Sequence, residues 1–166
     1  ACAVRARLFD QLDAGLRQGH RLLLICAPAG FGKTTLLSEW IGNFRLPILG
    51  FGSESHPQPI THNPQFCWLS LDDDDNDPTR FLLYLLAALE TACPDIGADA
   101  RAMIQPPQPL QLTTILTILL NRLAATLSEG NLLLALDDYH VIEQPAIHDL
   151  VAFLLDHLPP HMHLAV

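Results

Sequence analysis

The sequence has little positive charge, no hydrophobic run of membrane-spanning length and no targeting signal at its start. Nine Lys and Arg residues stand against eighteen Asp and Glu residues, which gives a formal net charge of −9. Proteins that bind nucleic acid use clustered Lys and Arg at the phosphates, so this balance argues against nucleic-acid binding by this segment. No apolar run reaches the roughly 18 residues that cross a bilayer, and no basic region precedes an apolar one. We therefore expect a cytoplasmic chain without a membrane partner.

Disulfide and metal-binding patterns are also missing. The cysteines form no C-x-x-C pair, so we expect them to be small, buried hydrophobic residues in a reducing compartment. No Cys or carboxylate at suitable spacing completes a zinc site with His157, His161 and His163. The acidic run at 72–77 does not fit a calcium-binding EF-hand loop, because Pro78 stands where glycine is required, and we expect a solvated turn there. The four cysteines are Cys2, Cys26, Cys67 and Cys93.

The length of 166 residues suits about one domain. A domain of this size buries about 70% of the surface that its unfolded chain exposes, so a sizeable core is possible. The sequence begins at Ala1 without an initiator methionine and stops at Val166 inside a predicted strand. We therefore expect a part of a longer protein.

The sequence does contain a phosphate-binding loop. In the stretch Arg21–Trp40, RLLLICAPAGFGKTTLLSEW, an apolar run at 22–26 leads into a glycine-rich turn and then into apolar residues at helical spacing. The run is short and rich in branched side chains, which predicts a central strand covered on both faces. The turn fits the Walker A spacing G-x-x-x-x-G-K-[ST], with Ala27 in place of the first glycine. Gly42-Asn43 is the predicted end of the helix.

Each residue type in this loop suits the binding of a polyphosphate. Backbone N–H groups must converge on the phosphate oxygens, and glycine permits the tight curl that this requires. The helix that opens at Lys33 adds the positive end of its dipole, the lysine reaches the β- and γ-phosphates, and the Thr34 hydroxyl is a ligand for Mg²⁺. The predicted nucleotide-binding residues are Ala29, Gly30, Phe31, Gly32, Lys33, Thr34 and Thr35.

Around this loop the sequence alternates between helices, strands and proline-rich breaks. The first helix is amphipathic, carries Asp13 away from its apolar face and ends at Gly19. Asp77 is the predicted N-cap of a later helix, and 94–109 is a proline-rich break. The predicted units are a helix at 1–20, the Walker A unit at 21–42, a loop insertion at 43–65, a strand and helix at 66–93, a helix and strand at 110–138, and a helix and fourth strand at 144–166.

The apolar strand at 132–136 ends in two carboxylates, which is the Walker B form. A buried strand among parallel neighbours delivers its last residues to the crevice where ligands bind in open α/β sheets. Asp137 is therefore predicted to meet the Mg²⁺ beside Thr34, usually through water. Asp138 is predicted to orient or deprotonate an attacking water. His140 is a further candidate for a polar group beside the site, although a hydrogen-bonded loop histidine is the favoured explanation.

Strands that alternate with helices predict parallel β-α units with right-handed crossovers and helices on both faces. We therefore expect an α/β fold, a P-loop NTPase with three α/β/α layers and a mainly parallel sheet, truncated after the fourth core strand. The chain has a strand near 66–71 and a second acid directly after Asp137. In these features it resembles the ATPase branch of the P-loop proteins, in which an additional strand separates the Walker A and Walker B strands in the sheet. Because the chain stops in its fourth strand, we expect that strand at an exposed sheet edge.

The chain resembles one family within this branch, the large signal-transducing (STAND) ATPases related to MalT and found in LuxR-type transcriptional activators. The resemblance to their NTPase domain excludes only 43–65 and 94–109, and DNDPTRF and LDDYH are its most specific motifs. The Val4-Arg5-x-Arg7-Leu8 segment is similar to the family's segment beside the nucleotide base, which implies Arg5 in the site. The matching stretches are APAGFGKTTLLSEW, WLSLDDDDNDPTRFLLYLLAALE, LLLALDDYHVI and IHDLVAFLLDHLPPHMHLAV.

The resemblance implies ATP or ADP with Mg²⁺ as cofactors, the metal at Asp137 and the hydrolytic water at Asp138. In the family, ATP and an inducer bound by C-terminal helical repeats drive self-association and expose a helix-turn-helix domain, and hydrolysis resets the switch. We therefore expect an ATP-binding, slowly hydrolysing switch domain that self-associates, with DNA bound only through domains absent from this chain. The family's sensor arginine is absent as well, so we expect weak or no hydrolysis by this segment.

Two other functions are compatible with the phosphate loop. A small-molecule kinase shares it but usually needs lid arginines, and no arginine follows Asp138. A non-catalytic interaction domain that has lost nucleotide binding is disfavoured by the presence of Lys33, Thr34 and Asp137 together.

Overall fold

The computed structural model describes residues 2–28, 30–45, 65–94, 96–104, 111–127 and 131–166. Within them, four strands form one sheet in the order β1-β4-β3-β2, and every pairing is parallel. The predicted α/β fold is therefore confirmed. β4 lies between the strand before the phosphate loop and the strand that ends in Asp137, as the predicted branch requires. The strands are β1 (Leu22–Leu23), β2 (Gln65–Ser70), β3 (Leu132–Asp137) and β4 (Met162–Ala165).

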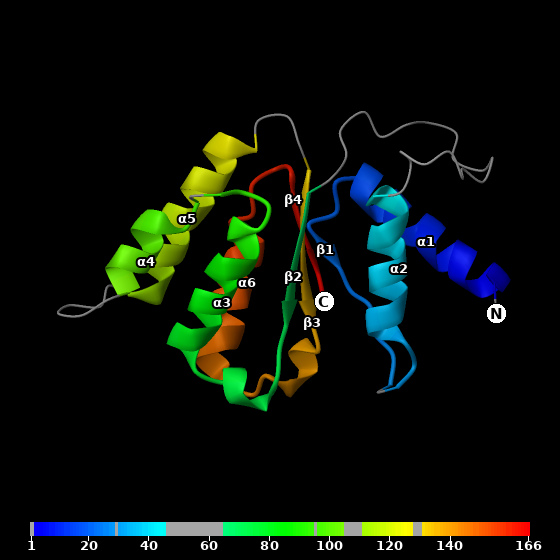
Figure 1. Ribbon diagram of the computed structural model, residues 1–166, viewed down its shortest axis with the longest axis horizontal. Helices are drawn as coiled ribbons and strands as arrows, with labels where there is room; N and C mark the ends of the chain where they lie inside the picture. Colours follow the sequence, from blue (N-terminus) through cyan, green and yellow to red (C-terminus); the bar gives the residue numbers. More distant parts are fainter. Residues whose placement is uncertain (1, 29, 46–64, 95, 105–110, 128–130) are drawn as a thin grey trace.

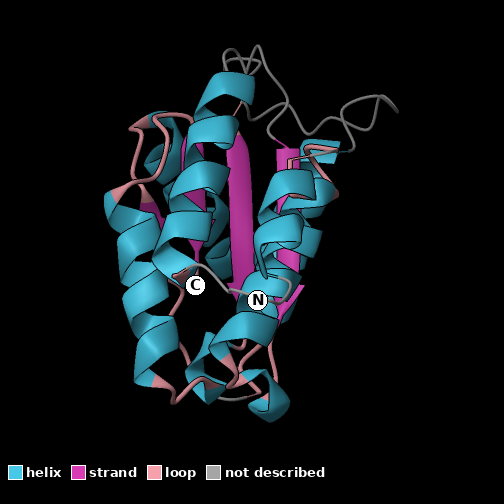
Figure 2. Cartoon of the chain, turned by 90° about the vertical axis from the view of Figure 1, so that its left-hand side faces the viewer, coloured by secondary structure: helices cyan, strands magenta, loops and turns pink. Residues whose placement is uncertain are grey.

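Helices cover both faces of the sheet, so that the strands run between two helical layers (Figures 1 and 2). All six residues of β3 are buried, and they alternate between two cores. Leu132, Leu134 and Leu136 belong to the core with α3–α6, whereas Leu133 and Ala135 belong to the core with α1 and α2. One layer is α1 (Cys2–Arg17) and α2 (Lys33–Arg45), and the other is α3 (Pro78–Glu90), α4 (Ala98–Ile104), α5 (Leu112–Thr126) and α6 (Pro145–Asp156).

β1 is an edge strand of this sheet rather than the predicted central strand. Its pairing with β4 continues beyond Leu23, because the backbone N–H of Ile25 donates to the carbonyl of Val166 at 2.7 Å. Leu23 is 6% exposed, but Leu22 and Leu24 are 41% and 70% exposed. The prediction of a strand covered on both faces is therefore wrong. In the described part of the chain β1 has one neighbour, and the core formed with α3–α6 does not include its outward side chains.

The fourth strand lies inside the sheet, so the prediction of an exposed edge there is also wrong. β4 pairs with β3 on one side and with β1 on the other, and its four residues are buried. The crossover through α6 inserts the strand between its neighbours instead of adding it at the end. His163 on this strand is 2% exposed, and its Nδ1 lies 2.8 Å from the carbonyl of His20, so it is a hydrogen-bonded core histidine.

Several predicted boundaries shift. α2 continues through Gly42 and Asn43 to Arg45, so the predicted helix end is wrong; the buried Trp40 and Ile41 hold this turn against the sheet. The loop insertion predicted at 43–65 is therefore too long at both ends, because β2 already begins at Gln65. The rest of that insertion, 46–64, lies outside the described residues.

A short helix, α4, lies within the predicted proline-rich break at 94–109, so the prediction of a break is wrong for Ala98–Ile104. It is tied to α3 by Arg101, whose Nε donates to the Glu90 carboxylate at 3.0 Å. The predicted N-cap of α3 is confirmed, because the Asp77 side chain accepts the backbone N–H of Arg80 at 2.8 Å. None of the helices in the described ranges combines the length and the apolar character needed to cross a membrane.

One polar side chain of α1 differs from expectation. Asp13 of α1 is 7% exposed, and it accepts the Trp40 indole N–H at 2.7 Å, so its predicted place away from the apolar face is wrong. The indole donor compensates for the burial of the carboxylate. Gly19 follows α1 at φ +70°, as predicted for a helix end.

The cysteines only partly follow the prediction of buried hydrophobes. Cys67 and Cys93 are buried, and burial raises the pKa of both thiols, that of Cys67 to about 11. Cys26 is exposed, because it lies just beyond the edge strand β1.

Candidate nucleotide-binding site

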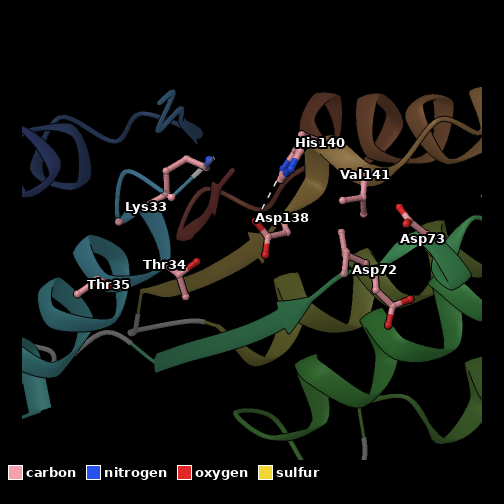
Figure 3. A pocket seen from close by; sticks show the side chains of 11 residues that line it. Lys33, Thr34, Thr35, Asp72, Asp73, Asp138, His140 and Val141 are labelled. Carbon is pink, nitrogen blue, oxygen red and sulfur yellow. Dashed lines mark ion pairs between the residues drawn. The ribbon is translucent and has the colours of Figure 1, made fainter. Parts of the chain in front are cut away.

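A cavity of about 520 Å³ lies where the chain leaves the carboxyl ends of the sheet strands. The phosphate loop and the first turn of α2 form one wall, and the segments after β2 and β3 form the other (Figure 3). Parallel sheets place their ligand sites at this end. The loop contributes Gly30, Gly32, Lys33, Thr34 and Thr35, and the opposite wall contributes Leu71, Asp72, Asp73, Asp138, His140 and Val141.

The two glycines of the loop have left-handed backbone conformations, with φ of +80° at Gly30 and +77° at Gly32. No heavy atom would lie within 3.9 Å of a Cβ placed at either position, so conformation rather than crowding requires glycine there. The helix begins directly after this curl, since the backbone N–H of Leu36 donates to the Gly32 carbonyl at 2.8 Å. The predicted site residue Ala29 lies outside the described residues.

Lys33 is the single lysine of the chain, and it lies across the loop that precedes it. Its Nζ donates to the Ala27 carbonyl at 2.9 Å and lies 3.5 Å from the Pro28 carbonyl. These carbonyls hold a positive charge inside the curl, at the wall of the cavity. A phosphate oxygen is a stronger partner for an ammonium group than a neutral carbonyl, so an anion entering the cavity would compete for this amine.

The hydroxyl of Thr34 donates to the carboxylate of Asp137 at 2.9 Å. Asp137 is the last residue of β3 and is 6% exposed. The structure therefore brings the first turn of α2 and the end of β3 into contact, and the predicted role of this pair in binding a metal stays a prediction. Hydroxyl and carboxylate oxygens are the donors that Mg²⁺ prefers, so these residues fit a magnesium ion. Among the described residues no three His, Cys, Asp or Glu side chains form a metal cage.

Asp138 has an unusual backbone, with φ of +57°, the single left-handed non-glycine residue among those described. This conformation turns the chain out of β3 into the short 3-10 helix η3 (Tyr139–Val141). The Asp138 side chain is 43% exposed on the cavity wall, and its carboxylate lies 3.7 Å from His140 Nδ1 (Figure 3). The structure thus brings Asp138 and the candidate His140 to the same wall.

The acidic run is more than the predicted solvated turn. It forms the 3-10 helix η2 (Asp73–Asp75), in which Asp75 is 4% exposed and its carboxylate accepts the backbone N–H of Asp72 at 2.9 Å. Asp72 and Asp73 line the cavity. Sequence reasoning missed both residues, together with Leu71 and Val141. The signal that would have found them is their position directly after β2 and β3.

Arg5 and Phe31 lie beside the loop but outside this cavity. Both line a second cavity of about 710 Å³ between α1, β1 and the other side of the phosphate loop, which Lys33 also reaches. Arg5 Nη1 lies 2.6 Å from each carboxylate oxygen of Glu39 on α2, and Phe31 is 76% exposed. The predicted role of Arg5 at the nucleotide base stays a prediction.

The sheet order β1-β4-β3-β2, the curl before Lys33 and the carboxylate that meets Thr34 together define a P-loop NTPase-like α/β domain. No family model matches the chain.

The chain is 36% identical over 163 residues to the HTH-type transcriptional regulator MalT of Cronobacter sakazakii, a match that covers 98% of the chain. It is equally similar to the regulators of the same name from two strains of Klebsiella pneumoniae. The chain is therefore MalT-like over almost its whole length, and it spans 16% of the length of these relatives.

Proposed function

We propose that this chain is the ATP-binding, slowly hydrolysing switch domain of a MalT-like transcriptional regulator. In the whole protein its nucleotide state would control self-association, and DNA binding would be carried by other domains. The name of the relatives supports the regulatory part of the proposal. The net charge of −9 supports a division of labour in which this segment does not contact DNA.

The observation that carries the nucleotide-binding part is the 2.9 Å hydrogen bond between Thr34 and Asp137. Thr34 lies in the first turn of α2, the helix that follows β1, and Asp137 ends β3; β1 and β3 are not neighbouring strands. Their meeting places two hard oxygen donors together where Thr34 lines a cavity that also has an amine and two left-handed glycines on its wall. That combination suits a polyphosphate with its magnesium ion.

The charges around the cavity support a requirement for the metal. Lys33 shares the cavity lining with the carboxylates of Asp72, Asp73 and Asp138, and the Asp137 carboxylate accepts the Thr34 hydroxyl. A triphosphate bound without a cation would meet this excess of negative charge in a partly enclosed space. When bound, Mg²⁺ would neutralise part of the phosphate charge, and Thr34 and Asp137 would hold it.

The residues of the two walls have separate roles in this proposal. The loop amides and Lys33 bind the phosphates, and Asp138, exposed on the opposite wall, orients the attacking water and accepts its proton. His140 lies on the same wall, with its Nδ1 3.7 Å from the Asp138 carboxylate.

Thermal unfolding tests the proposal. A ligand that binds only the folded state at 100 times its Kd adds about 2.7 kcal/mol to the free energy of unfolding. For a chain of this size that is a rise in Tm of about 5–10 °C, which we expect with Mg-ATP and with Mg-ADP. ATP with excess chelator should give a much smaller rise. An unchanged Tm at millimolar Mg-ATP would contradict the proposal, and phosphate transferred to an added metabolite would favour a kinase instead.

A further inference from the structure

The side chain of Asn76 bridges the two segments that form the cavity wall opposite the phosphate loop. Asn76 lies between η2 and α3 and is half-buried. Its Nδ2 donates to the carbonyls of Asp73 and Val141, each at 3.1 Å. Its Oδ1 accepts the backbone N–H groups of Glu143 at 2.7 Å and Gln144 at 3.1 Å. One amide thus uses both donors and both acceptor positions on backbone groups of two different segments.

This arrangement fixes the orientation of the amide without ambiguity. Rotating the group by 180° would set its oxygen against two carbonyls and its nitrogen against two N–H groups. Among side chains, only the amides of asparagine and glutamine supply two N–H donors and an oxygen that accepts twice. Glutamine is longer by one methylene and would not fit the same four partners. The site therefore requires asparagine itself.

The bridge reaches Asp138 through the backbone of η3. The N–H of Val141 donates to the Asp138 carbonyl at 3.1 Å, and the Val141 carbonyl is held by Asn76. Asp138 has φ of +57°, a conformation that is unfavourable for a residue with a Cβ and that persists only where its surroundings hold it. Asn76 holds the segment on the far side of this residue, at Val141, Glu143 and Gln144.

We propose that Asn76 is a positioning residue that fixes the wall bearing Asp138 and His140, independently of the phosphate loop. The inference rests on the proposed function for its consequence in hydrolysis, but the positioning itself does not depend on nucleotide. Within the described ranges, the side-chain hydrogen bonds of Lys33, Thr34 and Asp137 are made without Asn76. Loss of the Asn76 amide should therefore leave nucleotide affinity almost unchanged and reduce turnover.

Amide hydrogen exchange on the whole chain tests the positioning. Asn76→Ala should speed exchange at Val141, Glu143 and Gln144 by about tenfold or more, because their bonds to the amide or to the turn that it holds are lost. Exchange at Leu134 in β3 should not change. Asn43→Ala, a substitution of an exposed asparagine in α2, is the matched control and should leave all these rates unchanged.

Asn76→Asp distinguishes hydrogen bonding from shape. It keeps the volume and the acceptor for Glu143 and Gln144 but replaces both donors by carboxylate oxygen facing the carbonyls of Asp73 and Val141. Exchange at Val141 should rise by about tenfold, while Glu143 and Gln144 stay protected.

For both Asn76 variants the affinity for Mg-ATP should remain within about threefold of the unmodified chain, and kcat should fall by about tenfold with KM unchanged.

The outcomes separate the two proposals. Unchanged exchange at Val141 in both Asn76 variants, or an equal rise at Leu134, would overturn the positioning role even if Mg-ATP binds. Selective exchange at Val141 in a chain that does not bind Mg-ATP would support the positioning role and remove the proposed function.

Discussion

Replacing Lys33 by alanine should weaken the binding of Mg-ATP by about 100-fold, which corresponds to roughly 2.7 kcal/mol. Lys33 is the single lysine of the chain, and no Lys or Arg joins it among the described residues that line the 520 Å³ cavity. Its hydrogen bonds to the carbonyls of Ala27 and Pro28 are local, so their loss should leave the sheet intact. Calorimetric titration measures the affinity, and the melting curve checks the fold.

The matched control for this substitution is Arg17→Ala. Arg17 is an exposed residue in the last turn of α1, and its removal changes the formal net charge by the same one unit. We expect the affinity of this variant to stay within about twofold of the unmodified chain, because exposed charges farther away than about one Debye length are screened. Equal affinities of the unmodified chain and Lys33→Ala would remove the phosphate site from the account.

Asp137→Asn should abolish the magnesium dependence of ATP binding. The amide oxygen of the asparagine can still accept the Thr34 hydroxyl, which is 2.9 Å away from the carboxylate, so the packing at the end of β3 is kept and only the charge is lost. We expect Mg²⁺ to strengthen ATP binding by at least about tenfold in the unmodified chain and by less than about threefold in the variant. Titrations with and without excess chelator measure this ratio.

The neighbouring acid provides the control. Asp138 is 43% exposed on the cavity wall opposite the phosphate loop. The Thr34 hydroxyl donates to Asp137 and not to Asp138. Asp138→Asn should therefore keep the full magnesium dependence of binding and lower the rate of hydrolysis instead. A loss of magnesium dependence in Asp138→Asn rather than in Asp137→Asn would reverse the roles that we assign to the two acids.

The sequence predicts those parts of the site that depend on local patterns. Glycines 30 and 32 were predictable because a phosphate curl needs backbone conformations that other residues avoid, and both have positive φ. The buried strand before Asp137 was predictable from its unbroken apolar run, and all of β3 is buried. The fold class follows from the alternation of such strands with amphipathic helices.

What the sequence did not reveal depends on contacts between distant segments. The edge position of β1 follows from the insertion of β4 beside it, and no property of residues 22–26 specifies that order. The burial of Asp13 depends on the indole of Trp40, which lies 27 positions later. In the sequence, Asn76 is one polar residue in an acidic run. Its hydrogen bonds to Val141 and Glu143 form only in the folded chain.

Chemical modification of the single lysine tests most directly whether the wall formed by Lys33 and Thr34 binds the phosphates of a magnesium nucleotide. With an amine-selective reagent, Lys33 and the N-terminal amine are the two sites of reaction, and peptide mass spectrometry follows each separately. We predict that saturating Mg-ATP slows modification of Lys33 by at least about tenfold and leaves the rate at the N-terminal amine unchanged. The same rate at Lys33 with and without Mg-ATP would contradict the account.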